Sequence, residues 1–319
     1  MSRDILVAGE TLIDWIPERS GPLEEVPGFE RRPGGAPANV AVALARLEDP
    51  PLFWTRVGDD PFGRYLERTL VDHGLPDQFL ERDPAAKTTL AFVTHDETGE
   101  REFTFYRDGT ADTRLEPGRV DDATLANCEW VHAGGVTLSS GSAREATLDL
   151  LERAAAADCT VSFDPNLRSE LWPDEGAFAS VVGDALAYVD VCLATGPELA
   201  ALGYEGESAT AIARAAVERG LVHTAVVTRG AAGAVAVASA DAPWPAATVE
   251  HLGFAVETVD TTGAGDAFVA GAIAALRDGD DLEAAVTVAN AVGARATTAA
   301  GGMTALPTRA EVAALLEAE

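Results

Sequence analysis

The stretch with the clearest chemistry is residues 262–266, Thr-Gly-Ala-Gly-Asp, which runs directly into an apolar helical pattern. Gly263 and Gly265, on either side of Ala264, predict a tight turn that leaves backbone N–H groups free at a helix start. Those groups and the helix dipole form an anion site. Asp266 would be repelled by a bound phosphate unless it had a task there, such as accepting a hydroxyl proton. The pattern predicts phosphoryl transfer; the alternative is an ordinary turn with Asp266 as a helix cap.

A second glycine turn precedes another helical pattern near the N-terminus. Gly34 and Gly35 would let the backbone approach a ligand, and Asn39 falls in the first turn of the following helix. An amide both donates and accepts hydrogen bonds, as recognition of sugar hydroxyls requires. Asp14 is expected to end the first strand, which starts with the apolar run 5–9, and to accept from a hydroxyl. Capping or turn roles for Asn39 and Asp14 are the ordinary alternatives.

Residues 89–94 and 101–107 are β-rich and predict a hairpin. A hairpin inside an alternating β/α chain is expected outside the main sheet, either as a lid over the site or as a plain surface feature. Arg107 closes its second strand and could reach an anion or a ligand hydroxyl. A solvated arginine is the alternative.

The elements that must position these residues alternate between strands and helices along most of the chain. Such alternation predicts a mostly parallel sheet covered on both faces, with ligands beyond the carboxyl ends of the strands. We find no linker or internal repeat, so we expect one domain over residues 1–319. Further polar residues follow predicted strand ends: Asp164 with Asn166 and Arg168, Glu198, and Thr228 with Gly230.

The composition excludes several partners. A net charge of −29 argues against nucleic acid, which is bound through basic patches. Lys87 is the only lysine among 23 basic residues, a bias typical of salt-adapted proteins, whose self-repulsion is screened within about 3 Å in concentrated salt. An acidic mesophilic protein is the alternative.

We expect a cytoplasmic protein without a membrane span. The apolar runs are shorter than the ~18 residues needed to cross a bilayer, and the N-terminus enters a strand directly, without a signal-peptide pattern. Three cysteines, Cys128, Cys159 and Cys192, are widely spaced and form no CxxC, so they are expected as reduced core thiols.

Other common chemistries lack their motifs. The chain has no GxxxxGK[ST] loop, no GxGxxG after the first strand, no HExxH and no GxSxG. What remains is a site in which backbone amides, arginine and a magnesium ion handle phosphate while a carboxylate handles the acceptor hydroxyl.

Three blocks in order carry a family resemblance: PGGAPANVAVALARL at 33–47, FDPNLR at 163–168 and DTTGAGDAF at 260–268. Over nearly its full length the chain resembles the ribokinase-like (PfkB) family of sugar kinases. The resemblance implies a three-layer α/β/α fold with a mostly parallel central sheet and a small β lid, formed here by about residues 12–33 and 88–108. It also implies ATP as phosphate donor, with Mg²⁺, and often a homodimer that forms through the lid.

The resemblance also implies residue roles. Asp266 is the base, and Gly263, Ala264 and Gly265 form the anion hole. The substrate residues are Asp14, Gly34, Gly35, Asn39, Arg107 and Arg168. The nucleotide residues are Asn166, Thr195, Glu198, Thr228, Gly230, Gly233 and Asn290. Glu198 belongs to an Asn-x-x-Glu motif that organises magnesium, but Thr195 replaces its asparagine and lacks the amide, which puts that role in question. Asp260, with Gly301, is a candidate neighbour of a monovalent cation such as K⁺.

The substrate is less sharply specified. GGAPAN and residues 103–107, followed by Ala111 and Asp112, are similar to the bacterial-type fructokinase branch, which implies phosphorylation of a primary hydroxyl, fructose to fructose 6-phosphate. The 2-keto-3-deoxygluconate kinases usually carry Tyr-Tyr-Arg in the lid, where Phe105 stands here. Such a kinase, another sugar or nucleoside kinase, and a non-catalytic sugar or nucleotide sensor remain alternatives.

Overall fold

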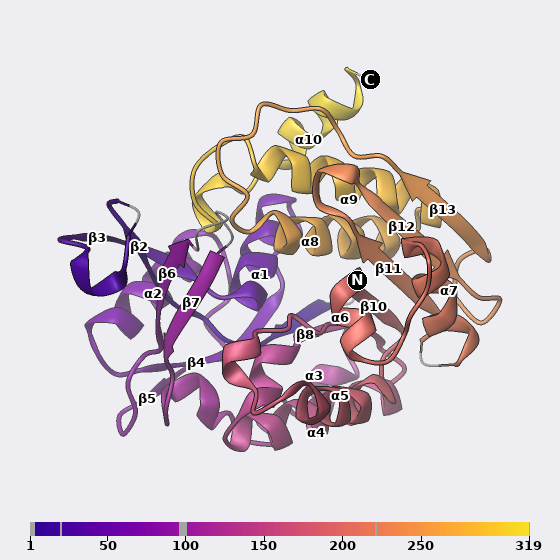
Figure 1. Cartoon of the computed structure of the whole chain (residues 1–319). Helices are drawn as coiled ribbons and strands as arrows, with labels where there is room; N and C mark the ends of the chain where they lie inside the picture. Colours follow the sequence, from indigo (N-terminus) through magenta and orange to yellow (C-terminus); the bar gives the residue numbers. More distant parts are fainter. Residues whose placement is uncertain (1–3, 20, 96–100, 221, 319) are drawn as a thin grey trace.

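Two sheets organise the computed structural model, which describes residues 4–19, 21–95, 101–220 and 222–318 (Figure 1). In the described residues the larger sheet has nine strands in the order β13-β12-β11-β10-β9-β8-β1-β4-β5. The pairs from β5 to β11 are parallel, and β12 and β13 add an antiparallel edge. The strands are β1 (Asp4–Ala8), β4 (Leu52–Gly58), β5 (Leu80–Asp83), β8 (Cys128–Gly134), β9 (Thr160–Asp164), β10 (Val191–Thr195), β11 (Thr224–Thr228), β12 (Ala234–Ala238) and β13 (Ala247–His251).

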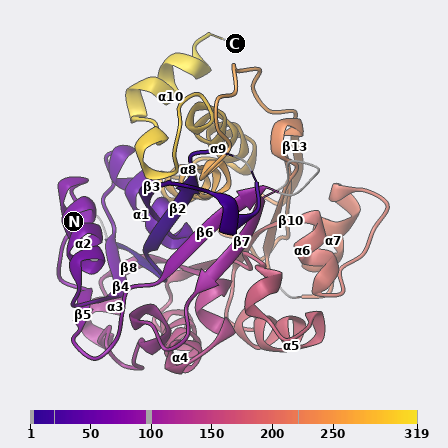
Figure 2. The ribbon, with the colours of Figure 1, turned by 60° about the vertical axis from the view of Figure 1, so that its left-hand side comes forward.

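Helices cover both faces of this sheet, as Figures 1 and 2 show. One core contains side chains of α1 (Ala36–Arg46), α2 (Pro61–Asp72), α8 (Ala264–Arg277), α9 (Leu282–Ala296) and α10 (Arg309–Leu316). The other contains side chains of α3 (Asp122–Leu125), α4 (Ser142–Ala156), α5 (Glu175–Leu186), α6 (Gly196–Ala201) and α7 (Ala209–Glu218). In β1, Ile5 and Val7 enter the first core while Leu6 and Ala8 enter the second, which explains its unbroken apolar sequence. The expected three-layer α/β/α fold is confirmed.

A smaller sheet has the order β3-β2-β6-β7 and lies beside the main one. Its strands are β2 (Leu12–Pro17), β3 (Phe29–Gly34), β6 (Leu90–His95) and β7 (Arg101–Tyr106). The antiparallel β6–β7 pair confirms the predicted hairpin, whose connecting residues 96–100 lie outside the described residues. A lid function for this sheet stays a prediction.

The prediction that Asp14 ends the first strand is wrong. Strand β1 stops at Ala8, and Asp14 belongs to β2 of the smaller sheet. The reason is Gly9, with a φ of 154°, where an added Cβ would lie 2.2 Å from Pro37 Cγ. The chain therefore turns between the sheets at residues 9–11, although its apolar pattern continues across the break.

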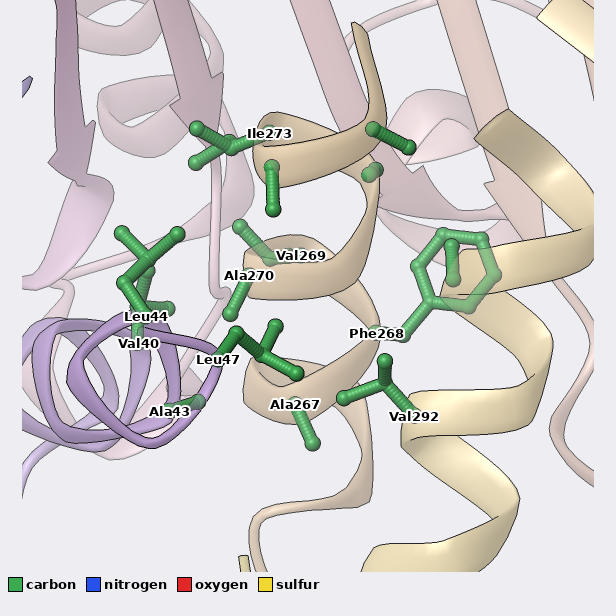
Figure 3. Close-up of a cluster of buried hydrophobic side chains, with 14 of the residues drawn as sticks. Val40, Ala43, Leu44, Leu47, Ala267, Phe268, Val269, Ala270, Ile273 and Val292 are labelled. Carbon is green, nitrogen blue, oxygen red and sulfur yellow. The ribbon is translucent and has the colours of Figure 1, made fainter. Parts of the chain in front are cut away.

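Helices α1, α8 and α9 pack side by side and hold the N-termini of α1 and α8 in place (Figure 3). All side chains of α8 from Ala267 to Leu276 are buried, as expected for a helix that is apolar on every side. The approach to α9 is close, since a Cβ at Gly271 would lie 2.9 Å from Ala289 Cα. The start of α8, which carries Asp266, thus belongs to a closely packed helix layer. Within the described ranges no helix has the length and apolarity to cross a membrane.

Candidate active site

A cavity of about 410 Å³ lies between the smaller sheet, the N-termini of α1 and α8, and the carboxyl end of the main sheet. This volume falls in the range of about 300–1,000 Å³ typical of small-molecule sites. Nine of the predicted site residues line it: Asp14, Gly35, Asn39, Asn166, Arg168, Asp260, Gly263, Asp266 and Gly301. The structure therefore brings together residues far apart in the chain, such as Asp14 and Asp266, which are separated by 252 positions.

Asp266 and Asn39 form the central contact of the cavity. The Asn39 Nδ2 donates a hydrogen bond of 2.7 Å to Asp266 Oδ2. Neither side chain caps its own helix, because Gly35 and Gly263 occupy the N-cap positions without a side-chain cap. This excludes the capping alternative for both residues. Gly263 takes the left-handed conformation, with a φ of 74°, that the turn before α8 requires.

Burial and two neighbouring side chains act on the Asp266 carboxyl in opposite directions. Burial raises the pKa of its carboxyl, while the hydrogen bond from Asn39 and the charge of Arg168 lower that pKa in part. A raised pKa would strengthen a general base, and the hydrogen bond from Asn39 orients the carboxylate. The Arg168 guanidinium lies 5.5 Å from the centroid of the Phe103 ring, so the smaller sheet contributes to holding it beside the cavity.

A carboxylate cluster lies next to Asp266. Burial, followed by the charges of Glu198 and Asp266, raises the pKa of Asp164 well above its usual value. Glu198 Oε2 accepts from the Thr195 backbone N–H at 2.7 Å, and the Glu198 N–H donates to Thr195 Oγ1 at 3.4 Å, which forms a capping box at the start of α6. The Thr195 hydroxyl also lies 2.8 Å from Glu198 Oε2. Its Oε1 accepts from the Leu167 N–H at 2.9 Å. Thr195 thus orients Glu198 in place of an asparagine.

The remaining predicted nucleotide residues lie outside the lining of this cavity. Thr195 and Thr228 pair in register at the ends of β10 and β11. Gly230 and Gly233 follow with φ values of 58° and 81°, and a Cβ at Gly233 would lie 2.0 Å from the His251 carbonyl oxygen. Asn290 is buried in α9, where its Nδ2 donates to the Val286 carbonyl one turn earlier. A nucleotide role for these residues stays a prediction.

Asp260 joins the loop before α8 to the loop after α9. Its Oδ1 accepts from the backbone N–H and hydroxyl of Thr262 at 2.9 and 2.6 Å, and its Oδ2 accepts from the Gly301 N–H at 2.8 Å. These contacts hold the turn before α8, in which the Ala264 N–H donates to the Thr261 carbonyl at 3.3 Å. An anion-hole role for the N–H groups of Gly263, Ala264 and Gly265 stays a prediction.

The glycines of the N-terminal block allow close approaches. A Cβ at Gly34 would lie 2.0 Å from Asp14 Oδ2. Gly35 has a φ of 104°, and a Cβ there would lie 2.5 Å from the Glu10 carbonyl oxygen. A side chain at either position would displace the walls of the cavity, so both glycines shape the site.

The structure corrects the prediction for Arg107. This side chain neither lines the cavity nor faces solvent; the residue is 5% exposed. Its Nε donates to Asp112 Oδ2 at 2.6 Å, and its Nη1 donates to Ser139 Oγ at 2.7 Å. A buried guanidinium requires such partners, and they come from η2 (Ala111–Arg114) and η3 (Gly135–Ser139), which sequence spacing did not connect with the hairpin.

Glu10 lines the cavity and was not predicted as a site residue. Its Oε1 accepts from the Ala36 N–H at 3.3 Å, at the N-terminus of α1. Burial raises its pKa to about 7, opposed mainly by the charge of Arg107. A charged residue directly after the apolar run 5–9 was the available signal, and it was interpreted as a continuation of the strand.

Comparison with known proteins decides the family. Residues 2–309 match the model of the pfkB family carbohydrate kinases. The chain belongs to this family.

Relatives of this PfkB kinase include named fructokinases. It is 38% identical to a fructokinase from Vibrio alginolyticus over 97% of both chains. Its fold is similar to that of a fructokinase with bound ATP from Xylella fastidiosa, with a TM-score of 0.86, 33% identity and coverage of 100% and 99% of the two chains. It is also similar to a fructokinase double mutant from Vibrio cholerae O395 in a fructose-, ADP- and potassium-bound form, with a TM-score of 0.84, 34% identity and coverage of 99% and 98%.

Proposed function

We propose that this PfkB kinase transfers the terminal phosphoryl group of ATP to the primary 6-hydroxyl of fructose. The observation that carries the proposal is the Asp266 carboxylate, held by Asn39 at the N-terminus of α8 within a cavity lined by polar groups from the smaller sheet and α1. The named fructokinases among the relatives support fructose as the acceptor.

In this mechanism Asp266 accepts the proton of the attacking hydroxyl. Phosphoryl transfer passes through a loose transition state in which the nucleophile needs little early deprotonation, so alignment and charge stabilisation supply most of the rate. The N–H groups at residues 263–265 and the dipole of α8 would receive the transferred phosphoryl group, and Arg168 would neutralise part of its charge.

The smaller sheet would exclude water from this reaction. Val93, Phe103 and Phe105 come from β6 and β7 and line the cavity. Apolar side chains over the phosphoryl group would disfavour water as a competing acceptor, which limits ATP hydrolysis.

Mg²⁺ would enter with the nucleotide. Among the described residues no group of three His, Cys, Asp or Glu side chains is arranged to hold a metal ion, which fits an ion bound mainly by phosphates and water. The negative charges of Glu198 and Asp266, which both act on Asp164, would also favour a cation nearby. When bound, the ion would offset phosphate charge, while Glu198 would keep the loops after β9 and β10 in place through Leu167 and Thr195.

For K⁺, we propose a site at the two loops that Asp260 joins, the loop before α8 and the loop after α9. The potassium-bound relative supports this proposal.

The test is a phosphorylation panel with ATP in molar KCl: fructose, glucose, ribose, 2-keto-3-deoxygluconate and adenosine. Fructose is expected to have the highest kcat/KM. The sugar acid belongs in the panel because Arg32 and Arg168 both line the cavity and could hold a carboxylate. Absence of fructose turnover would refute the proposed acceptor.

The role of Asp266 is tested by Asp266→Asn, with Asp278→Asn at the other end of α8 as control. The first variant is expected to lose about 10²- to 10⁴-fold in kcat while calorimetry still detects binding of ADP. Wild-type turnover by this variant would refute the base assignment. Binding without turnover by the wild-type protein would instead favour a sensor.

Three further properties are part of the proposal. The smaller sheet is the expected interface of a homodimer; its strand β7 carries Tyr106, which is 59% exposed. Light scattering measures the oligomeric state.

A net charge of −29 supports function in concentrated salt. The three buried thiols support a reducing, cytoplasmic location.

A further inference from the structure

The floor of the cavity holds a carboxylate oxygen without a protein partner. Glu10 is 2% exposed and lies in the turn between β1 and β2. Its Oε1 accepts from the Ala36 N–H, but its Oε2 is buried and has no hydrogen-bond partner among the described residues. An unpartnered buried carboxylate oxygen is costly, so its position at a ligand cavity indicates that a ligand supplies the donor.

Two further acceptor oxygens share this situation. Asn39 Oδ1 and Asn166 Oδ1 are buried without partners among the described residues, and both side chains line the same cavity as Glu10. A ligand that presents several donors would match three unpaired acceptors around one cavity. Sugar hydroxyls provide such donors.

Arg107 is a buried positive charge that acts on Glu10 from outside the lining of the cavity. It does not line the cavity, yet its charge is the largest influence that lowers the pKa of Glu10. Its Nε and Nη1 are held by Asp112 and Ser139, while its Nη2 is buried without a partner among the described residues. Asp112 is itself anchored, since its Oδ1 accepts from the Thr110 hydroxyl at 2.8 Å and from that of Thr89.

We propose that Glu10 binds a hydroxyl of the sugar directly through Oε2, and that the buried positive charge of Arg107, held by Asp112 and Ser139 outside the lining of the cavity, supports this contact without touching the substrate. This inference rests on the proposed sugar-kinase function and adds to it a substrate contact on the side of the cavity formed by the β1–β2 turn. It also gives Arg107 a role consistent with its burial.

The first experiment is a thermodynamic cycle that compares kcat/KM of the wild-type protein and of Glu10→Gln. Each protein is assayed with fructose and with deoxy analogues that lack the 1-, 3- or 4-hydroxyl. Glutamine keeps the size of the side chain and removes its charge. For fructose the variant is expected to lose about 10- to 100-fold in kcat/KM, the range for a hydrogen bond to a charged group. For the analogue that lacks the bound hydroxyl, the wild-type protein loses a similar factor and the variant loses nothing further. Glu24→Gln, on the exposed η1 (Leu23–Glu25), is the matched control.

An equal loss for fructose and every analogue, or no loss at all, would overturn the contact. This result differs from failure of the proposed function, in which the wild-type protein does not phosphorylate fructose. In that case the cycle is run with the sugar of the panel that is phosphorylated and with its deoxy analogues.

The second experiment tests Arg107 through the pH dependence of kcat/KM. The charged groups that act on Glu10 are Arg107, Asp112 and Arg168, and Asp164 and His132 line a smaller void that Glu10 also borders. Loss of the positive charge in Arg107→Met is expected to move the acid limb of the profile to higher pH. Arg107→Lys, which keeps the positive charge, is expected to keep the acid limb of the kcat/KM profile at its wild-type pH. This variant also tests the effect of the charge if Arg107→Met does not fold.

The shift seen in Arg107→Met is expected to vanish when Arg107→Met is combined with Glu10→Gln, because the titrating group is then absent. A merely structural role of Arg107 would lower activity without this dependence on Glu10. Arg68→Lys on the exposed face of α2 serves as control. A shift that persists in the Glu10→Gln background would overturn the supporting role of Arg107.

Discussion

The charge on Glu10 is expected to cost stability in the absence of sugar, and Glu10→Gln measures that cost. Glutamine removes the charge while leaving the shape of the side chain and its contact with the Ala36 N–H region. The residue is 2% exposed, so solvent screens the carboxylate little. The variant protein is therefore expected to be more stable than the wild type wherever Glu10 is ionised.

The magnitude follows from the shift of the carboxyl pKa from 4.5 to about 7, which corresponds to about 3 kcal/mol. The unfolded chain loses this proton near pH 4.5 and the folded chain near pH 7. Because the folded state holds the proton more tightly, the unfolding free energy falls as pH rises through this interval, and the full cost is present above it.

Urea unfolding of both proteins at one KCl concentration provides the assay. The free-energy difference in favour of Glu10→Gln is expected to be about 1 kcal/mol near pH 5.5 and about 3 kcal/mol above pH 8. Glu24→Gln, on the exposed η1, should show no such trend. A difference that does not change with pH would refute the reasoning, because it would mean that Arg107 keeps the Glu10 carboxylate ionised throughout.

Three further predictions concern the same site and the surface. Asn39→Ala removes the hydrogen bond that lowers the pKa of Asp266, so that pKa should rise and the acid limb of the kcat/KM profile should move to higher pH. An unmoved limb would contradict a catalytic effect of this hydrogen bond. Gly35→Ala forces a side chain into positive φ and toward the Glu10 carbonyl, and should cost at least about 2 kcal/mol in urea unfolding. Gly183→Ala, in an open position of α5, should instead be neutral or stabilising by up to about 1 kcal/mol. Raising KCl from about 0.1 M to about 1 M shortens the screening length from about 10 Å to about 3 Å and should raise the thermal midpoint of this acidic protein; a falling midpoint would contradict salt adaptation.

The main sheet could be predicted because its strands are buried on both faces. The apolar runs at 224–228 and 191–194 admit few other interpretations, and both form strands of that sheet. Strand β5, LERD, does not follow from its own largely polar sequence, and β3, FERRPG, follows only from the family resemblance that places residues 12–33 in the β lid. Their pairing partners, β2 and β4, determine their structure more than their own pattern does.

The site could be predicted where its residues belong to contiguous blocks. Asn39 and Asp266 were found because each follows a glycine turn at a helix start. The positions of Glu10 and Arg107 depend instead on partners far apart in the chain, such as Ser139, which lies 32 residues beyond Arg107. Burial of a charge is decided by such contacts, and a single sequence does not display them.

The placement of the base–amide pair has a consequence for the turnover cycle. Asn39 and Asp266 are carried by α1 and α8, two helices that pack directly against each other (Figure 3). Asp14, Phe103 and Phe105 are carried by the smaller sheet. We therefore expect that the strands over the cavity can move to admit sugar and release product while the pair remains assembled. Each new substrate would then meet a base that needs no reorganisation before the next transfer.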